Sequence, residues 1–160
     1  MPLHLVARAT KVCLLIALTA SASRLALAES NKTSASNLMP LYVKECAACH
    51  IAYPPGMLPA ASWQRIMRNL SQHFGADASL DAESVKQISN WLTNHSTTES
   101  GGQAVPEDRI TRSTWFRREH AEVPSSVWKR ATIKSPSNCA ACHTRADQGN
   151  FDEHFVRIPQ

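Results

Sequence analysis

Apolar residues recur at helical spacing in several parts of this chain and predict a mostly helical fold. From Pro59 to Gly75 they follow one another at intervals of three, one, three and four residues, which is the spacing of one helix face. These residues are Trp63, Ile66, Met67, Leu70 and Phe74. The next helix is expected to begin after Asp81, a good N-cap residue, and to carry a second apolar stripe. That stripe consists of Val85, Ile88 and Leu92.

Further helices and a turn are expected along the rest of the chain. One helix covers residues 41–50, and another covers 109–121, before the proline at position 124. A short turn capped by Ser125 or Ser126 follows, and a last helix runs from the asparagine to the glycine that bound residues 138–149. No segment alternates strictly between apolar and polar residues, so we predict an all-α fold with little or no strand.

A polar segment with a Gly-Gly pair, residues 96–106, divides the chain into two halves. We expect an N-terminal domain over 38–95, a linker over 96–106 and a C-terminal domain over 107–160. The segment 29–37 is rich in Ser, Asn and Thr and is expected to be a flexible lead-in. Halves this small are marginal for independent folding and usually need a disulfide, a metal or a cofactor to stabilise the fold.

Residues 1–28 have the pattern of a secretory signal peptide. Two basic residues precede an apolar run over 12–20, and a small-x-small motif ends at Ala28. Cleavage is expected after Ala28, which would place the mature protein in the periplasm without stable membrane insertion. The run is far shorter than the roughly 20 residues that cross a bilayer. An uncleaved membrane anchor is the alternative, since Arg24 follows the apolar run.

Composition and charge exclude some classes of protein. Apolar residues make up 43% of the 160 residues and charged residues 19%, which is typical of a globular chain. Seventeen Lys and Arg against 13 Asp and Glu give a net charge of +4. Three of those basic residues lie within residues 1–28, so the mature chain has a net charge of only +1. Nucleic acid is therefore not an expected partner.

Four of the five cysteines fall into two identical Cys-Ala-Ala-Cys-His pentapeptides, which occupy residues 46–50 and 139–143. Cys-x-x-Cys-His is the attachment signature of c-type haem. The two thiols of each motif form thioethers with the haem vinyl groups, and the adjacent histidine becomes the proximal iron ligand. The pattern predicts two covalently bound haem c groups. The attaching thiols are Cys46, Cys49, Cys139 and Cys142, and the proximal ligands are His50 and His143.

Other roles for the cysteine pairs fit less well. Cys139 follows Cys49 by 90 residues, whereas the pairs of compact zinc modules lie roughly 15–20 residues apart. Thioredoxin-like redox pairs would require a βαβ context, which the sequence lacks. Structural disulfides remain possible in an oxidising compartment. None of these roles explains why a histidine follows each pair.

The sixth iron ligand decides what each haem can do. Two histidines give a closed, low-potential carrier, a methionine raises the potential, and an open position permits ligand chemistry. The candidates are His73, His95, His120, His154, Met39, Met57 and Met67. We favour His73, which ends the first apolar stripe, and His120, which lies one turn after Phe116. His95 and His154 are the less favoured distal alternatives.

Several blocks along the mature chain resemble the dihaem cytochrome c family that partners the oxygen-binding sphaeroides haem protein. They are residues 46–54 (Cys-Ala-Ala-Cys-His-Ile-Ala-Tyr-Pro), 70–75, Trp115, 119–120, 138–143, Gly149, Phe151 and 158–159. The resemblance implies an N-terminal half like a minimal class I cytochrome c and a less ordinary C-terminal half. It also implies bis-His iron at both haems, with His50 paired to His73 and His143 paired to His120. The implied redox partners are a cytochrome like sphaeroides haem protein and a membrane cytochrome of the b561 type.

The expected function is electron transfer and not catalysis. Two bis-His haems would exchange electrons with redox partners by outer-sphere transfer in the periplasm. The alternatives are a small dihaem enzyme of the peroxidase or reductase type, or a haem-based sensor. Both alternatives require one haem with a labile sixth ligand, which carbon monoxide would reveal.

Overall fold

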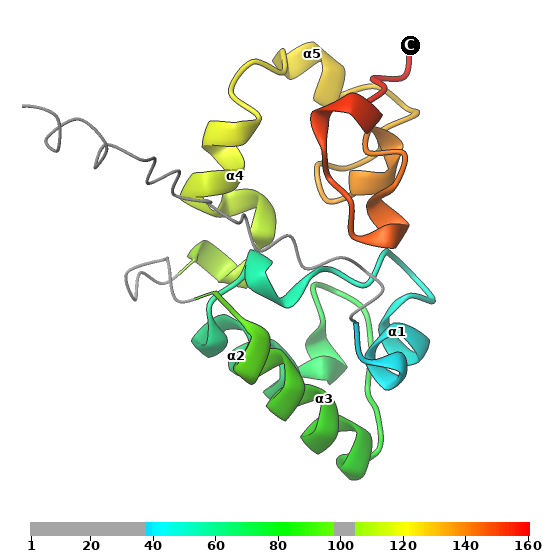
Figure 1. Ribbon diagram of the computed structural model, residues 1–160. Coiled ribbons are helices and arrows are strands. Elements are labelled where there is room, and N and C mark those ends of the chain that lie inside the picture. Colours follow the sequence, from blue (N-terminus) through cyan, green and yellow to red (C-terminus); the bar gives the residue numbers. More distant parts are fainter. Residues whose placement is uncertain (1–37, 98–104) are drawn as a thin grey trace, which may run out of the picture. The chain divides into compact units, whose positions relative to one another are not determined.

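The computed structural model describes residues 38–97 and 105–160. The expectations for the signal segment, the lead-in and most of the linker lie outside these residues, and the division into two domains stays a prediction. The described backbone is helical (Figure 1) and contains no strand beyond three isolated bridges. This confirms the predicted all-α fold.

The described residues form five α-helices and seven short 3-10 helices. The α-helices are α1 (Pro40–Cys46), α2 (Ala60–Arg68), α3 (Ala82–His95), α4 (Thr114–Glu119) and α5 (Ser125–Trp128). The 3-10 helices are Pro55–Met57, Leu70–Gln72, Pro106–Asp108, Ile110–Arg112, Cys139–Ala141, Ala146–Gln148 and Glu153–Phe155.

Helix α3 is the longest helix of the described residues, and its start and buried face agree with the sequence pattern. The Asp81 carboxylate accepts hydrogen bonds from the main-chain N–H groups of Glu83 (3.0 Å) and Ser84 (2.9 Å). These bonds satisfy donors that the first helical turn leaves free, so the predicted N-cap is confirmed. Ile88 and Leu92 are 0% exposed, which confirms that this stripe faces the core.

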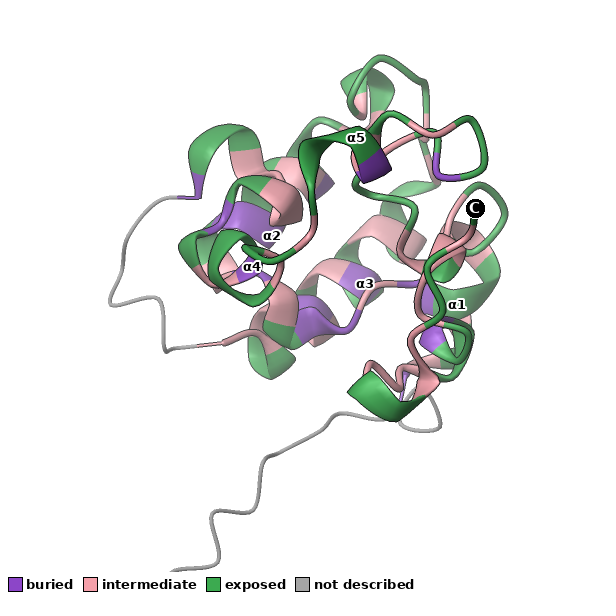
Figure 2. Ribbon diagram, turned by 90° about the horizontal axis from the view of Figure 1, so that it is seen from above, coloured by how far each residue is buried: buried purple, intermediate pink, exposed green. Residues whose placement is uncertain are grey.

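The main apolar core lies between helices α1, α2 and α3 (Figure 2). Its buried members are Leu38, Tyr42, Ala52, Leu58, Trp63, Met67, Ile88, Leu92 and Val105. The segment 106–160 contributes a much smaller set of buried apolar residues, namely Phe116, Val127, Ile133 and Ala146. The C-terminal half therefore has little apolar core of its own.

Two predicted helices in the N-terminal half are shorter than expected. Helix α1 ends at Cys46, so the rest of the first pentapeptide forms a turn. Helix α2 ends at Arg68 because the next residue, Asn69, has a non-helical backbone (φ −134°, ψ 42°). The prediction of one helical stripe reaching to His73 was therefore wrong. His73 follows a separate 3-10 helix, Leu70–Gln72.

The boundaries in the C-terminal half also differ from the prediction. The helix expected over 109–121 is only α4, because Ser113 caps it and accepts a hydrogen bond from the Phe116 N–H. Ser125 is the first residue of α5 and not its cap. Asn138 does not cap a helix, because its side-chain amide donates to the Ile133 carbonyl instead. Gly149 does end the 3-10 helix before it, with a left-handed φ of 65°.

The buried stripe of α3 yields a test of the core. We expect Leu92→Ala to lower the free energy of unfolding by about 2–5 kcal/mol, because it removes a fully buried side chain and leaves a cavity. Thermal and denaturant unfolding of the purified holoprotein measure the change. Lys86→Ala, on the exposed face of the same helix, is the matched control and should have a small effect. Equal effects of the two variants would contradict this arrangement of α3.

Candidate haem sites

The first pentapeptide begins at the C-terminal end of α1 and continues as a turn. Tyr42, buried in α1, donates its hydroxyl hydrogen to the Tyr53 carbonyl (2.8 Å), which ties the helix to the segment after the motif. The Nδ1 atom of His50 lies 2.7 Å from the Ile51 carbonyl oxygen. Because a carbonyl can only accept, Nδ1 carries the hydrogen, and Nε2 keeps the lone pair that a metal needs.

His50 and His73 lie beside each other although 23 residues separate them in the sequence. Their ring centroids are 6.1 Å apart, and the ring planes differ by 27°. Tyr53 stacks on the His50 ring at 4.7 Å and 20°, and Phe74 contacts the His73 ring edge-on at 4.9 Å. Aromatic rings therefore flank this pair of imidazoles on both sides.

A tight turn places His73. The Ala76 N–H donates to the His73 carbonyl at 3.0 Å, and the turn continues through Phe74 and Gly75, both with positive φ (51° and 99°). A left-handed backbone is unusual for a bulky residue such as Phe74, and such strain persists only where its surroundings enforce it. The Arg109 guanidinium lies 4.4 Å above the Phe74 ring and stabilises it by a cation–π contact.

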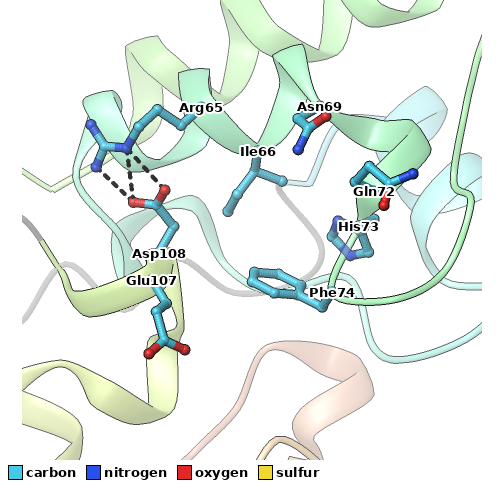
Figure 3. Close-up of a pocket in the computed structure, with 8 residues that line it drawn as sticks. All are labelled: Arg65, Ile66, Asn69, Gln72, His73, Phe74, Glu107 and Asp108. Atoms are coloured by element: carbon cyan, nitrogen blue, oxygen red, sulfur yellow. Dashed lines mark hydrogen bonds and ion pairs between the residues drawn. The ribbon is translucent and has the colours of Figure 1, made fainter.

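A pocket of about 200 Å³ opens between α2, this turn and the 3-10 helix Pro106–Asp108 (Figure 3). His73 and Phe74 lie at one end of it, and the ion pair of Arg65 with Asp108 lies at the other. Arg65 donates from Nε to Oδ2 (2.9 Å) and from Nη2 to Oδ1 (2.6 Å). Burial works to raise the pKa of Asp108, but the hydrogen bonds from Arg65 and Ser62 outweigh it and lower the pKa.

The lowered pKa of Asp108 predicts how the stability of the fold depends on pH. An aspartate with a lowered folded-state pKa stabilises the fold above its ordinary pKa of 3.8, and this contribution is lost as the pH falls through the lower folded value. We expect Asp108→Asn to be less stable than the parent at pH 7 and to approach the parent's stability as the pH falls below 3.8 and through the lowered folded pKa. Thermal unfolding across this range measures it. Arg65→Gln should behave in the same way, and independent, additive effects of the two substitutions would argue against the ion pair.

The second pentapeptide is held by the C-terminal tail. Its first three residues form the 3-10 helix Cys139–Ala141, and the His143 N–H donates to the Cys139 carbonyl at 2.8 Å. The Arg157 N–H donates to the Cys142 carbonyl, also at 2.8 Å, and Val156 forms an antiparallel bridge with His143. The tail showed no periodicity in the sequence, yet it fixes the main chain on both sides of the motif histidine.

His120 and His143 form the second pair of neighbouring imidazoles. Their centroids are 6.0 Å apart, and their planes differ by 73°. His120 directly follows α4, donates from Nδ1 to the Phe116 carbonyl (2.9 Å) and stacks on the Phe116 ring at 4.1 Å. Phe151 contacts the His143 ring edge-on at 5.2 Å. The Nδ1 atom of His143 is buried without a hydrogen-bond partner, an uncommon state for a structural imidazole.

Burial keeps two of these imidazoles neutral. It lowers the pKa of His73, with the nearby His50 and Arg109 adding to the effect. It also lowers the pKa of His143, with His120 adding to it. Neutral imidazole is the form that ligates a metal, so burial favours the ligating form in both pairs.

Burial raises the pKa of three of the motif thiols. The pKa of Cys46 and that of Cys139 are raised to about 11, and that of Cys142 is raised as well. In residues 38–97 and 105–160, no group of three or more His, Cys, Asp or Glu side chains is arranged to hold a metal ion. The four motif cysteines are all free of disulfides.

Tyr53 connects the first pair to the second pentapeptide, a role that the sequence did not indicate beyond its place in a resembling block. Its hydroxyl donates to the Ser137 carbonyl at 2.7 Å, and the Cys139 sulfur lies 3.6 Å from the same oxygen. Burial, with Cys139 adding to it, raises the pKa of Tyr53 to about 12, so the phenol keeps its hydrogen at neutral pH. In addition, the Trp115 indole N–H donates to the Met57 carbonyl (3.3 Å).

The other candidate ligands are held by local partners. His95 donates from Nδ1 to the Trp91 carbonyl (2.8 Å) and stacks on the Trp91 ring. His154 has a side chain that is 88% exposed and pairs with Asp152 at 2.7 Å. Met67 is buried in the core, Met39 packs against that core, and Met57 is half-buried.

No helix among the described residues is both long and apolar enough to span a bilayer. No match was found among the curated proteins. The family model for dihaem cytochrome c matches residues 42–151. A dihaem cytochrome c structure from Shewanella baltica OS155 is 38% identical, with a TM-score of 0.66, and the match covers 75% of this chain and 92% of that one.

Two structures of the dihaem cytochrome c from Rhodobacter sphaeroides match as well. One is 46% identical with a TM-score of 0.62, and the match covers 71% of this chain and 96% of that one. The other is 44% identical with a TM-score of 0.63, covering 72% and 98%. The two cysteine pairs are consistent with one attachment point for each of two haems. The chain therefore belongs to the dihaem cytochrome c family and carries two covalently bound haem c groups.

Proposed function

We propose that this protein is a periplasmic, outer-sphere electron carrier in which two histidines ligate each haem iron. His50 and His73 would hold the first iron, and His143 and His120 would hold the second. Membership of the dihaem cytochrome c family supports a haem electron-carrier role in general. The proposal goes beyond family membership in three respects, namely the ligand pairs, the compartment and the redox partners.

The spacing of the imidazole rings is the observation that carries the ligand assignment. A metal-bound imidazole nitrogen lies about 2 Å from the metal and about 1 Å from its own ring centre, so two rings on one iron have centroids about 6 Å apart. The two observed separations are 6.1 Å and 6.0 Å. Each pair joins one motif histidine to one histidine from a distant segment, as two axial ligands of a c-type haem require.

Bound haem supplies one-electron redox chemistry, and the chain's residues determine what else can happen at the iron. Histidines on both faces would leave no open position at the iron for a substrate. Tyr53 and Phe116 pack against these imidazoles and oppose their rotation away from the iron. An enzyme of the peroxidase type or a ligand sensor needs an open or labile position, so this arrangement favours a carrier.

The compartment and the partners are proposed from the sequence. The signal-peptide pattern of residues 1–28 supports export, and covalent haem attachment outside the bacterial cytoplasm is consistent with it. The proposed partners are a cytochrome like sphaeroides haem protein and a membrane cytochrome of the b561 type. With a mature net charge of only +1 before the haem propionates are counted, docking should be transient and only mildly sensitive to salt.

Carbon monoxide tests the function directly, because it binds ferrous haem only where an axial position is open or easily vacated. We expect the absorption spectrum of the fully reduced protein to stay unchanged under carbon monoxide at neutral pH. Conversion of about one haem per chain to the carbon monoxide form would contradict the carrier and favour the enzyme or the sensor.

A further inference from the structure

The two histidine pairs differ most clearly in how their ring planes are turned. The planes of His50 and His73 differ by 27° and are close to parallel, whereas those of His120 and His143 differ by 73° and are close to perpendicular. Ligand type and centroid spacing are the same in both pairs. On the basis of the proposed bis-His ligation, we propose that the C-terminal haem has the higher reduction potential of the two. When the protein holds a single electron, this haem is the one that is reduced.

The ring angle affects the energy of the oxidised iron. Low-spin ferric iron has one vacancy among three d orbitals, and two of these orbitals interact with the π systems of the axial rings. Parallel rings raise one of the two orbitals above the other, which stabilises the vacancy. Perpendicular rings act on both equally, so this stabilisation is lost. One added electron fills the vacancy, so ferrous iron gains nothing from the splitting, and the perpendicular site has the higher potential.

Packing around the second pair holds its rings in the perpendicular arrangement. The His120 ring lies on the Phe116 ring at 4.1 Å and 21°, and its Nδ1 atom is fixed by the Phe116 carbonyl. Trp128 contacts both rings, at 5.8 Å from His120 and 6.2 Å from Phe116. Phe116 is only 7% exposed and cannot easily move aside. Phe116 is thus a positioning residue that sets the plane of His120.

Different contacts set the near-parallel arrangement of the first pair. Tyr53 lies flat against His50, with 20° between the planes, and donates to the Ser137 carbonyl. Phe74 meets the His73 ring edge-on at 62° and is itself covered by Arg109. Each pair also contains one histidine whose Nδ1 donates to a carbonyl, at 2.7 Å for His50 and 2.9 Å for His120. This hydrogen bond is therefore present once in each pair and does not explain a difference in potential between the two haems.

The distribution of charged side chains also favours a higher potential at the C-terminal haem. Residues 38–97 contain four basic and four acidic side chains, whereas residues 105–160 contain nine basic and seven acidic ones. Arg109, whose charge reaches His73, is paired with Glu107. The charge of Arg130 reaches Cys142 in the second motif. Reduction adds a negative charge to the haem, so the net positive charge of the segment that carries the second pentapeptide favours the reduced form there.

A redox titration of the holoprotein followed by low-temperature EPR tests the order of reduction. Near-parallel rings give a low-spin ferric signal with three resolved features, and near-perpendicular rings give one broad feature at lower field. As the potential is lowered, the broad low-field feature should disappear first. Loss of the resolved signal first, or two signals of the same shape, would overturn the inference. A high-spin signal would refute bis-His ligation, so the two failures can be told apart.

Substitutions then assign the signals and test the positioning role. Phe116→Leu removes the stacked ring but keeps an apolar side chain, and it should move the low-field feature to higher field and lower the potential of that haem. Phe116→Tyr keeps the ring, so it should leave both the low-field feature and the potential of that haem as they are in the parent protein. Phe74→Leu is the matched control at the first pair and should alter only the resolved signal. An unchanged low-field feature in Phe116→Leu would overturn the role of Phe116.

Discussion

Expressed without haem attachment, the chain is expected to lose most of its helical structure and to show no cooperative thermal transition. Four of the five α-helices in residues 38–97 and 105–160 contain nine residues or fewer, and isolated helices shorter than about 12–15 residues are marginal in water. The segment 106–160 buries few apolar side chains. The two histidines proposed to ligate its haem, His120 and His143, are 23 residues apart in the sequence. Two covalent haems therefore supply much of the core and join distant segments.

Far-UV circular dichroism of two paired variants measures this dependence. Replacing Cys139 and Cys142 by alanine should remove more of the helical structure of the C-terminal half than replacing Cys46 and Cys49 removes from the N-terminal half. The reason is that the N-terminal half retains the core between α1, α2 and α3. The variant without any of the four thiols should lose the most helical structure of the three variants and should melt without a cooperative transition. A native-like spectrum with a sharp melting transition in that variant would contradict this account of the core.

Substituting either distal histidine should convert one haem, and only one, from low-spin to high-spin. With the proposed ligands, His73→Ala would leave His50 as the single protein ligand of the first iron, and His120→Ala would leave His143 as that of the second. Water is a weaker ligand than imidazole, so the affected iron becomes high-spin and open to carbon monoxide. The optical spectrum and the carbon monoxide difference spectrum of each variant should show half of the total haem changed.

His95→Ala and His154→Ala are the matched controls for this pair of variants. Both side chains are held by local partners, Trp91 and Asp152, so their loss should leave two low-spin haems that do not bind carbon monoxide. A high-spin haem in either control, with His73→Ala or His120→Ala still low-spin, would show that the distal ligands are assigned wrongly.

The sequence predicted the haem attachment points because their chemistry is local. Two thiols and a histidine within five residues need no tertiary information to be recognised. The helix α3 was also predictable, since its cap and its apolar stripe are contiguous. The neighbours of the motif histidines were harder, because His73 and His120 come from turns. The argument that placed His73 on a helical stripe was wrong, although the structure does bring its ring beside His50.

Long-range contacts account for what the sequence did not predict. The bond of Tyr53 to the Ser137 carbonyl spans 84 residues, and no local pattern indicates it. The bonds that the tail makes to the second pentapeptide come from a segment without periodicity. The early end of α2 depends on the backbone of Asn69, and local spacing predicted the helix to continue. Such features are decided by packing after the elements have formed, and packing overrides propensity.

Spin-integrated EPR of the fully oxidised holoprotein is the most direct test of two haems that are each ligated by a pair of histidines. The account predicts two low-spin ferric signals of equal intensity that together equal the total haem, with no significant high-spin signal. A high-spin signal equal to one haem per chain would show that one iron lacks its second imidazole and would contradict the account.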